Sequence, residues 1–72
     1  MPDLRIFVNE RGLTLPAGAT VRDALRAAQP ELEPLVAAGG AFVTDGRGVE
    51  IALDAVLAGG AILRAQRSSR RA

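Results

Sequence analysis

The stretch Pro16-Ala17-Gly18-Ala19-Thr20-Val21-Arg22-Asp23-Ala24-Leu25-Arg26-Ala27-Ala28 predicts a turn followed by one amphipathic helix. Thr20 is a favourable N-cap, and Asp23 three residues later completes a capping box in which Asp replaces the usual Glu or Gln. Four apolar residues follow the helical spacing i, i+3, i+4, i+7: Val21, Ala24, Leu25 and Ala28. Pro30 ends the helix, because the residue before a proline avoids the helical region. We therefore expect a helix from about Thr20 to Gln29 whose apolar face packs against the rest of the chain.

Short runs of alternating apolar residues on both sides of this helix predict strands. Residues 4–8 and 13–15 alternate, and the polar stretch between them predicts a hairpin turn with Gly12 in a left-handed conformation. Beyond the helix, residues 31–38 fit one or two helical turns, although Pro34 weakens the first half. Residues 41–44 and 49–51, joined by Asp45-Gly46, predict a second and shorter hairpin, and residues 61–67 predict the last strand.

This order of elements predicts a single α+β domain over residues 1–67, followed by a flexible basic tail over residues 68–72. We expect a mixed sheet of four or five strands packed on one main helix, with the last strand returning beside the first. Ten residues are expected to supply most of the core: Leu4, Ile6, Val8, Leu13, Leu15, Val21, Leu25, Val43, Leu57 and Leu63.

The composition of the 72 residues excludes several classes of chemistry, because the chain contains neither Cys nor His. Disulfides, Cys/His zinc sites, iron–sulfur ligation, thiol nucleophiles and Ser-His-Asp triads are all excluded. The carboxylates are scattered without metal-ligand spacing, so we predict no catalytic residue, no metal site and no cofactor, and the protein is not expected to be an enzyme. No apolar run approaches 18 residues and no signal peptide is evident, so we expect a soluble protein without a membrane partner. The absence of Cys fits a cytoplasmic protein of a bacterium.

The charges are unevenly distributed along the chain. All nine basic residues are Arg; residues 1–63 hold five of them against eight acidic residues, a net charge of −3. Residues 64–72 hold the other four Arg and no acidic residue, a net charge of +4. Because no aromatic residues are interleaved with these four charges, they are a weak signal for nucleic-acid binding.

Three short segments resemble the β-grasp, or ubiquitin-like, fold, and within it the small sulfur-carrier family of thiamine and molybdopterin synthesis (the ThiS/MoaD type). They are residues 5–9 (Arg-Ile-Phe-Val-Asn), residues 16–21 leading to Leu25, and residues 57–62 (Leu-Ala-Gly-Gly-Ala-Ile). The resemblance implies a β-grasp domain that binds a partner protein. Members of the family end in Gly-Gly, whose carboxylate is adenylated and converted to a thiocarboxylate. Here Arg70-Arg71 falls about where the diglycine would stand, so we expect that the chain is not itself a sulfur carrier.

The residues expected to bind a partner are Phe7, Arg64, Arg67, Arg70 and Arg71. Phe7 alternates away from the apolar face of the first strand, which places it on the open face of the sheet, and the family arrangement brings Arg64 or Arg67 near it. Aromatic and Arg side chains are enriched at binding hot spots. Phe42, in contrast, is expected to be a core residue under the helix.

We therefore predict a small non-catalytic protein-binding module of the ubiquitin-like kind, related to sulfur carriers, whose partner is a protein of unidentified type. The expected state is a monomer or a weak oligomer. Two alternatives stay open at this point. One is a sulfur carrier or modifier that serves as the substrate of an adenylating enzyme, and the other is an RNA- or nucleotide-associated domain resembling the TGS domains, which share the Pro-x-Gly-x-Thr entry to the helix.

Overall fold

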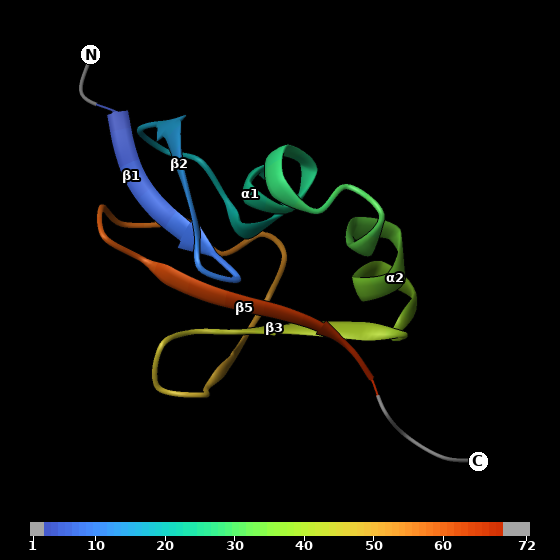
Figure 1. Cartoon of the computed structure of the whole chain (residues 1–72). Coiled ribbons are helices and arrows are strands. Elements are labelled where there is room, and N and C mark those ends of the chain that lie inside the picture. The colour runs from blue at the N-terminus through green and yellow to red at the C-terminus, as the bar shows by residue number, and fades with distance from the viewer. Residues whose placement is uncertain (1–2, 69–72) are drawn as a thin grey trace.

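The computed structural model of the chain describes residues 3–68 (Figure 1). These residues form five strands and two helices in the order β1 (Asp3–Val8), β2 (Arg11–Pro16), α1 (Val21–Ala28), α2 (Leu32–Ala38), β3 (Ala41–Thr44), β4 (Glu50–Ile51) and β5 (Ile62–Arg67). Arg70 and Arg71, two of the predicted partner-binding residues, lie outside the described residues.

The strands form one mixed sheet in the order β2-β1-β5-β3-β4. β1 pairs with β2 in an antiparallel hairpin and with β5 in a parallel ladder, while β3 pairs antiparallel with both β5 and β4. Both helices lie on the same side of this sheet (Figure 1). The fold is therefore α+β and compatible with a β-grasp fold, and the prediction that the last strand returns beside the first is confirmed.

The core lies between the helices and one face of the sheet. Seven of the ten predicted core residues are buried there, and Leu4, Leu13 and Leu15 are partly buried against them. Small residues complete the core, including Ala24, Ala41 and Ala65. Phe42 is not in the core: Ala41 and Val43, its neighbours in β3, are buried, so the alternation of the strand turns Phe42 to the opposite face. The prediction for Phe42 was wrong because it did not fix which residues of this short strand face inward.

The first hairpin turns through two residues, Asn9 and Glu10, rather than at Gly12. Asn9 has φ 50° and Glu10 has φ 72°, the pair of left-handed conformations of a type I′ turn, and Val8 is paired with Arg11. Gly12 lies within β2, where it is paired with Phe7. The predicted left-handed Gly12 is therefore wrong, and its place in the sheet has another cause, described below.

Helix α1 begins and ends as the sequence predicts. The Thr20 hydroxyl accepts a hydrogen bond from Asp23 N–H, and the Asp23 carboxylate accepts one from Thr20 N–H at 3.0 Å, so Asp serves fully in the capping box. All four apolar positions of α1 are buried.

The helical turns expected within residues 31–38 are confirmed as α2, but this helix has seven residues against the eight of α1, so the sheet packs on two helices rather than on one main helix. Pro34 does not prevent α2, because it occupies the first turn, where a backbone N–H has no partner within the helix. The helix ends at Gly39, whose φ of 89° is left-handed and suits glycine.

Glu33 joins the two helices through ion pairs with two arginines of α1. Its Oε1 accepts from Arg26 Nε at 2.9 Å, and its Oε2 lies 3.3 Å from Arg22 Nε. The hydrogen bond from Arg26 is the main cause that lowers the pKa of the Glu33 carboxyl below its usual value of 4.5, and the charges of Arg26 and Arg22 lower it further.

We expect Glu33→Gln to lower the free energy of unfolding at neutral pH and to lose this effect in acid. A carboxyl with a lowered folded pKa adds stability above its unfolded pKa, and that contribution disappears as the pH falls through the folded pKa. Urea unfolding of parent and variant should therefore differ at pH 7 and converge as the pH is lowered from 4.5.

Glu31→Gln is the matched control, because Glu31 forms no ion pair among residues 3–68. An equal loss of stability in both variants at pH 7 would contradict the assigned role of Glu33.

Candidate partner-binding face

The sheet face opposite the helices is left uncovered by the described residues, and we call it the open face. Successive side chains of a strand point to opposite faces of the sheet, so the residues next to the buried ones point to the open face. On the three central strands these residues are Arg5, Phe7, Phe42, Thr44, Ile62, Arg64 and Gln66.

Phe7 and Ile62 are neighbours at the centre of this face, because the parallel ladder pairs Phe7 of β1 with Ile62 of β5. Ile62 is 52% exposed, a large value for an aliphatic residue in a central strand. The two side chains line a hollow of about 350 Å³ together with Glu10, Leu63 and Arg64. We call this the Phe7 hollow.

The ring of Phe7 lies across the neighbouring strand β2, and Gly12 makes this possible. A Cβ atom at residue 12 would lie 3.2 Å from Cε2 of Phe7 and 3.3 Å from an Nη atom of Arg5, closer than ordinary van der Waals contact. The Arg5 guanidinium lies 5.9 Å from the ring centroid, a cation–π contact. A side chain at residue 12 would therefore crowd the Phe7 ring and the Arg5 guanidinium that lies over it.

The rim of the hollow carries more positive than negative charge. Arg64 and Glu10 line it directly, and the Arg5 guanidinium lies over the Phe7 ring, 5.9 Å from its centroid. None of these three side chains forms an ion pair within residues 3–68. Each of the two guanidinium groups can therefore donate two hydrogen bonds to a carboxylate of a partner without first breaking an ion pair.

Asn9 fixes β5 in the position that brings Ile62 and Arg64 beside Phe7. The pairing begins with Gly60 N–H donating to Arg5 O at 2.7 Å. It continues with Phe7 N–H donating to Ala61 O and Asn9 N–H donating to Leu63 O, both at 2.9 Å. There the backbone of β1 turns away, and the Asn9 side chain replaces it: Nδ2 donates to Ala65 O at 3.0 Å, and Oδ1 accepts from Ala65 N–H at 2.9 Å. The side-chain amide thus extends the parallel pairing by one more residue.

The structure brings together two of the predicted site residues, Phe7 and Arg64. It places Arg67 elsewhere, opposite Ala41 at the far end of β5, five residues beyond the position paired with Phe7. Sequence reasoning missed Ile62 and Glu10. The alternation of residues in the last strand could have indicated Ile62. Because Leu63 and Ala65 point into the core, Ile62 and Arg64 lie on the opposite face, which also carries Phe7.

No family model matches the chain, and no curated protein matches it. The protein is therefore classified by its fold alone, as a small α+β domain whose mixed sheet is compatible with a β-grasp fold. Two further findings apply to residues 3–68: no group of three or more acidic side chains gathers as metal ligands there, and no helix is long and apolar enough to cross a membrane.

We expect Asn9→Ala to destabilise the domain by about 1–3 kcal/mol, because it leaves the N–H and C=O of Ala65 unpaired in a residue that is 5% exposed. Urea unfolding measures the change. Asn9→Gly is the matched control, since glycine adopts the left-handed conformation of residue 9 freely but cannot form the two hydrogen bonds. If Asn9→Gly were as stable as the parent, the conformation rather than the hydrogen bonds would explain the effect of Asn9→Ala.

Proposed function

We propose that this protein is a small non-catalytic protein-binding module of the ubiquitin-like kind, and that the Phe7 hollow is its binding site. The observation that carries the proposal is the pairing of Phe7 with a half-exposed Ile62 on the open face, between two guanidinium groups that have no ion-pair partner in residues 3–68. A relationship to the sulfur carriers of the ThiS/MoaD type is part of this proposal and rests on the short sequence motifs quoted above.

The partner that fits this site is a protein surface that presents an apolar side chain flanked by carboxylates. The apolar side chain fills the hollow against Phe7 and Ile62, where water is excluded from aromatic and aliphatic carbon. The carboxylates pair with Arg5 and Arg64 at the rim. Aromatic and Arg residues contribute most to many protein interfaces, which supports this division between an apolar centre and a charged rim.

A non-catalytic role is supported by the residues that surround the hollow. Glu10 and the two arginines are its titratable groups among the described residues, and the chain has no Cys or His that could act as a nucleophile or a base near neutral pH. The site therefore provides apolar side chains and charged groups that can contact a partner protein.

The test is affinity capture from a lysate of the native host, with the parent chain and two variants as baits. Phe7→Ala and Ile62→Ala should each reduce the yield of the specifically captured protein, since truncating a hot-spot residue costs at least about 2 kcal/mol, or roughly thirtyfold in affinity. Thermal melting of each bait confirms that it is folded.

Val56→Ala is the matched control, because Val56 is a 70% exposed aliphatic residue outside the hollow. It should capture the partner as the parent does. If folded Phe7→Ala and Ile62→Ala baits retained the partner at the parental yield, the Phe7 hollow would not be the binding site.

A further inference from the structure

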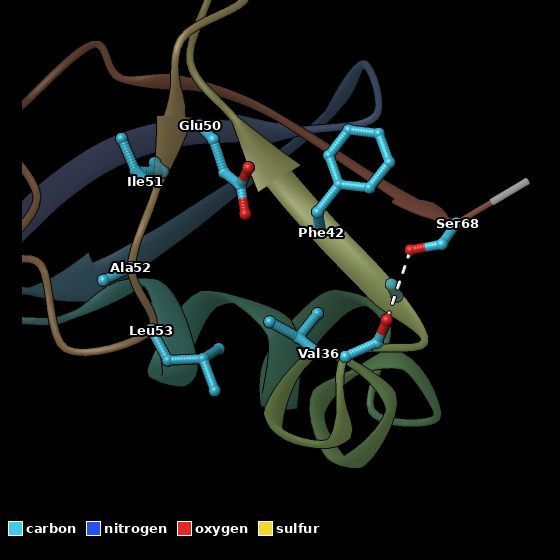
Figure 2. Close-up of a pocket in the computed structure, with 9 residues that line it drawn as sticks. Val36, Phe42, Glu50, Ile51, Ala52, Leu53 and Ser68 are labelled. Atoms are coloured by element: carbon cyan, nitrogen blue, oxygen red, sulfur yellow. Dashed lines mark hydrogen bonds between the residues drawn. The ribbon is translucent and has the colours of Figure 1, made fainter. Parts of the chain in front are cut away.

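The sheet ends on one side in β2, and no strand of the described residues lies beside the outer edge of β2. This strand spans six residues and pairs with β1 in a one-to-one register without a bulge. The strand at the opposite edge, β4, has two residues, and Figure 2 shows Leu53 beyond its end. There the chain leaves the sheet for α1, since Leu53 O accepts a hydrogen bond from Arg22 N–H at 2.9 Å. The long free edge of the described sheet is therefore that of β2.

Two residues of β2 direct their backbone groups to this outer edge. Phe7 N–H donates to Ala61 O, so the odd-numbered residues of β1 bond with β5 and the even-numbered ones bond with β2. In the register of the hairpin, the even-numbered residues of β1 are opposite Arg11, Leu13 and Leu15. Gly12 and Thr14 lie between these residues, so their N–H and C=O groups point away from β1.

The backbone groups of Gly12 and Thr14 are accessible and have no partner within residues 3–68. Both residues are exposed. No hydrogen bond of a turn, loop, cap or side chain in this part of the chain involves their N–H or C=O groups. Pro16, the next residue with the same orientation, has no N–H, and its C=O accepts from Ala19 N–H at 3.1 Å. The free edge thus consists of two N–H and two C=O groups.

This edge is complementary to a second copy of itself. In an antiparallel arrangement centred on Leu13, Gly12 of one chain is opposite Thr14 of the other, and such a pair exchanges two hydrogen bonds. A two-fold axis generates the pair twice, so every free N–H and C=O group of both edges has a partner. A register shifted to place Gly12 opposite Pro16 would lose donors, because proline has no N–H.

The side chains of β2 also fit this register. Leu13 is half-buried on the helix side of the sheet, and it would contact Leu13 of the second copy directly across the axis. Arg11, the charged residue of β2, would be opposite Leu15 of the second copy, so no like charges face each other between the strands. Arg11 Nη1 lies 3.5 Å from Ala28 O at the end of α1, which leaves the aliphatic part of its side chain to cover that leucine.

We infer that the chain forms a symmetric dimer through the outer edges of β2, which joins two five-stranded sheets into one. An exposed edge strand is a template for such pairing, and the two-fold arrangement leaves no further β2 edge free. Pairing of one strand edge covers less than the roughly 1,200 Å² of a standard interface, so we expect a weak dimer that forms at about 0.1–1 mM. The inference goes beyond the proposed function, because it does not depend on the Phe7 hollow.

The first experiment is sedimentation equilibrium of the full chain between about 10 µM and about 1 mM, with ¹⁵N NMR at the same concentrations. We expect the mass to rise from monomer to dimer and amide hydrogen exchange to become slower at Gly12 and Thr14. Leu13 is the internal reference, because its N–H is directed to β1 in the monomer as well. Thr14→Pro removes an N–H that β1 does not use, so it should weaken dimerisation at least about tenfold. Thr14→Ser keeps this N–H and is the matched control.

A disulfide tests the register. The chain contains no Cys, so a single introduced Cys pairs only with that of another copy. Leu13→Cys would place the two residues directly opposite each other, with Cα atoms about 4.5 Å apart and within reach of a disulfide. Leu15→Cys is the matched control, because it replaces another half-buried leucine of β2 whose two copies would lie about 13 Å apart along the strands. In oxidised glutathione, Leu13→Cys should cross-link at least about tenfold faster than Leu15→Cys.

A monomer at 1 mM would overturn the inference, and so would equal dimerisation of Thr14→Pro and the parent or equal cross-linking of the two Cys variants. Should Thr14→Pro fail to fold, the two Cys variants decide the question. Concentration-dependent shifts at Phe7 and Ile62, with none at Gly12 and Thr14, would place self-association in the Phe7 hollow and contradict the edge. Slower exchange at Gly12 and Thr14 with added acetyl-Thr-Val-Thr-Val-Thr-amide, but not with the chain itself, would assign the edge to a strand of another protein. Partner capture by Phe7→Ala and Ile62→Ala tests the proposed function alone, so the two claims fail separately.

Discussion

The parallel pairing of β1 with β5 is the interaction on which the rest of the structure depends. It joins the first strand to the last across more than fifty residues of chain, and it unites the β1–β2 hairpin with the β3–β4 hairpin in one sheet. The backbone contributes only a short ladder, which the side-chain amide of Asn9 lengthens by two hydrogen bonds to Ala65. Because this register sets Phe7 against Ile62, the same pairing builds the core on one face and the Phe7 hollow on the other.

A competition for carbonyl oxygens shapes the opposite edge of the sheet. The N-terminus of α1 needs acceptors for its first N–H groups, and Thr20 with Asp23 satisfies only part of that need. Leu53 and Ala55 supply the remaining acceptors, so the segment after Ile51 cannot also continue the ladder along β3. The short β4 results from this use of the 53–55 backbone. The capping of one helix thereby determines where the β3–β4 ladder ends.

The sequence predicted the elements that rest on local patterns and missed those that depend on contacts between distant residues. Thr20 and the apolar spacing of α1 were sufficient for its bounds and its buried face, and Phe7 was correctly placed opposite the core. Gly12 was predicted to be a left-handed turn residue. It lies instead within β2, beside the Phe7 ring of the neighbouring strand. The Arg22–Glu33–Arg26 contact joins two different helices, and the Asn9–Ala65 hydrogen bonds join residues far apart in the chain, so the pattern within one element does not predict either. Of the candidate site, Phe7 followed from alternation and Arg64 from the expected return of the last strand beside the first. Alternation in β5 also indicates that Ile62 lies on the open face, but its pairing with Phe7 required the register of β1 against β5.

The measurement that tests this account most directly is the nuclear Overhauser effect at the Phe7 ring. The chain contains two Phe residues and no Tyr or Trp, so the ring protons can be assigned without overlap from other aromatic types. Cross-peaks are expected between the Phe7 ring and the methyl groups of Ile62, because the two residues are paired on the open face. Cross-peaks from the Phe7 ring to Leu25 or Val21 in the core, with none to Ile62, would contradict both the register of β1 on β5 and the binding site built on it.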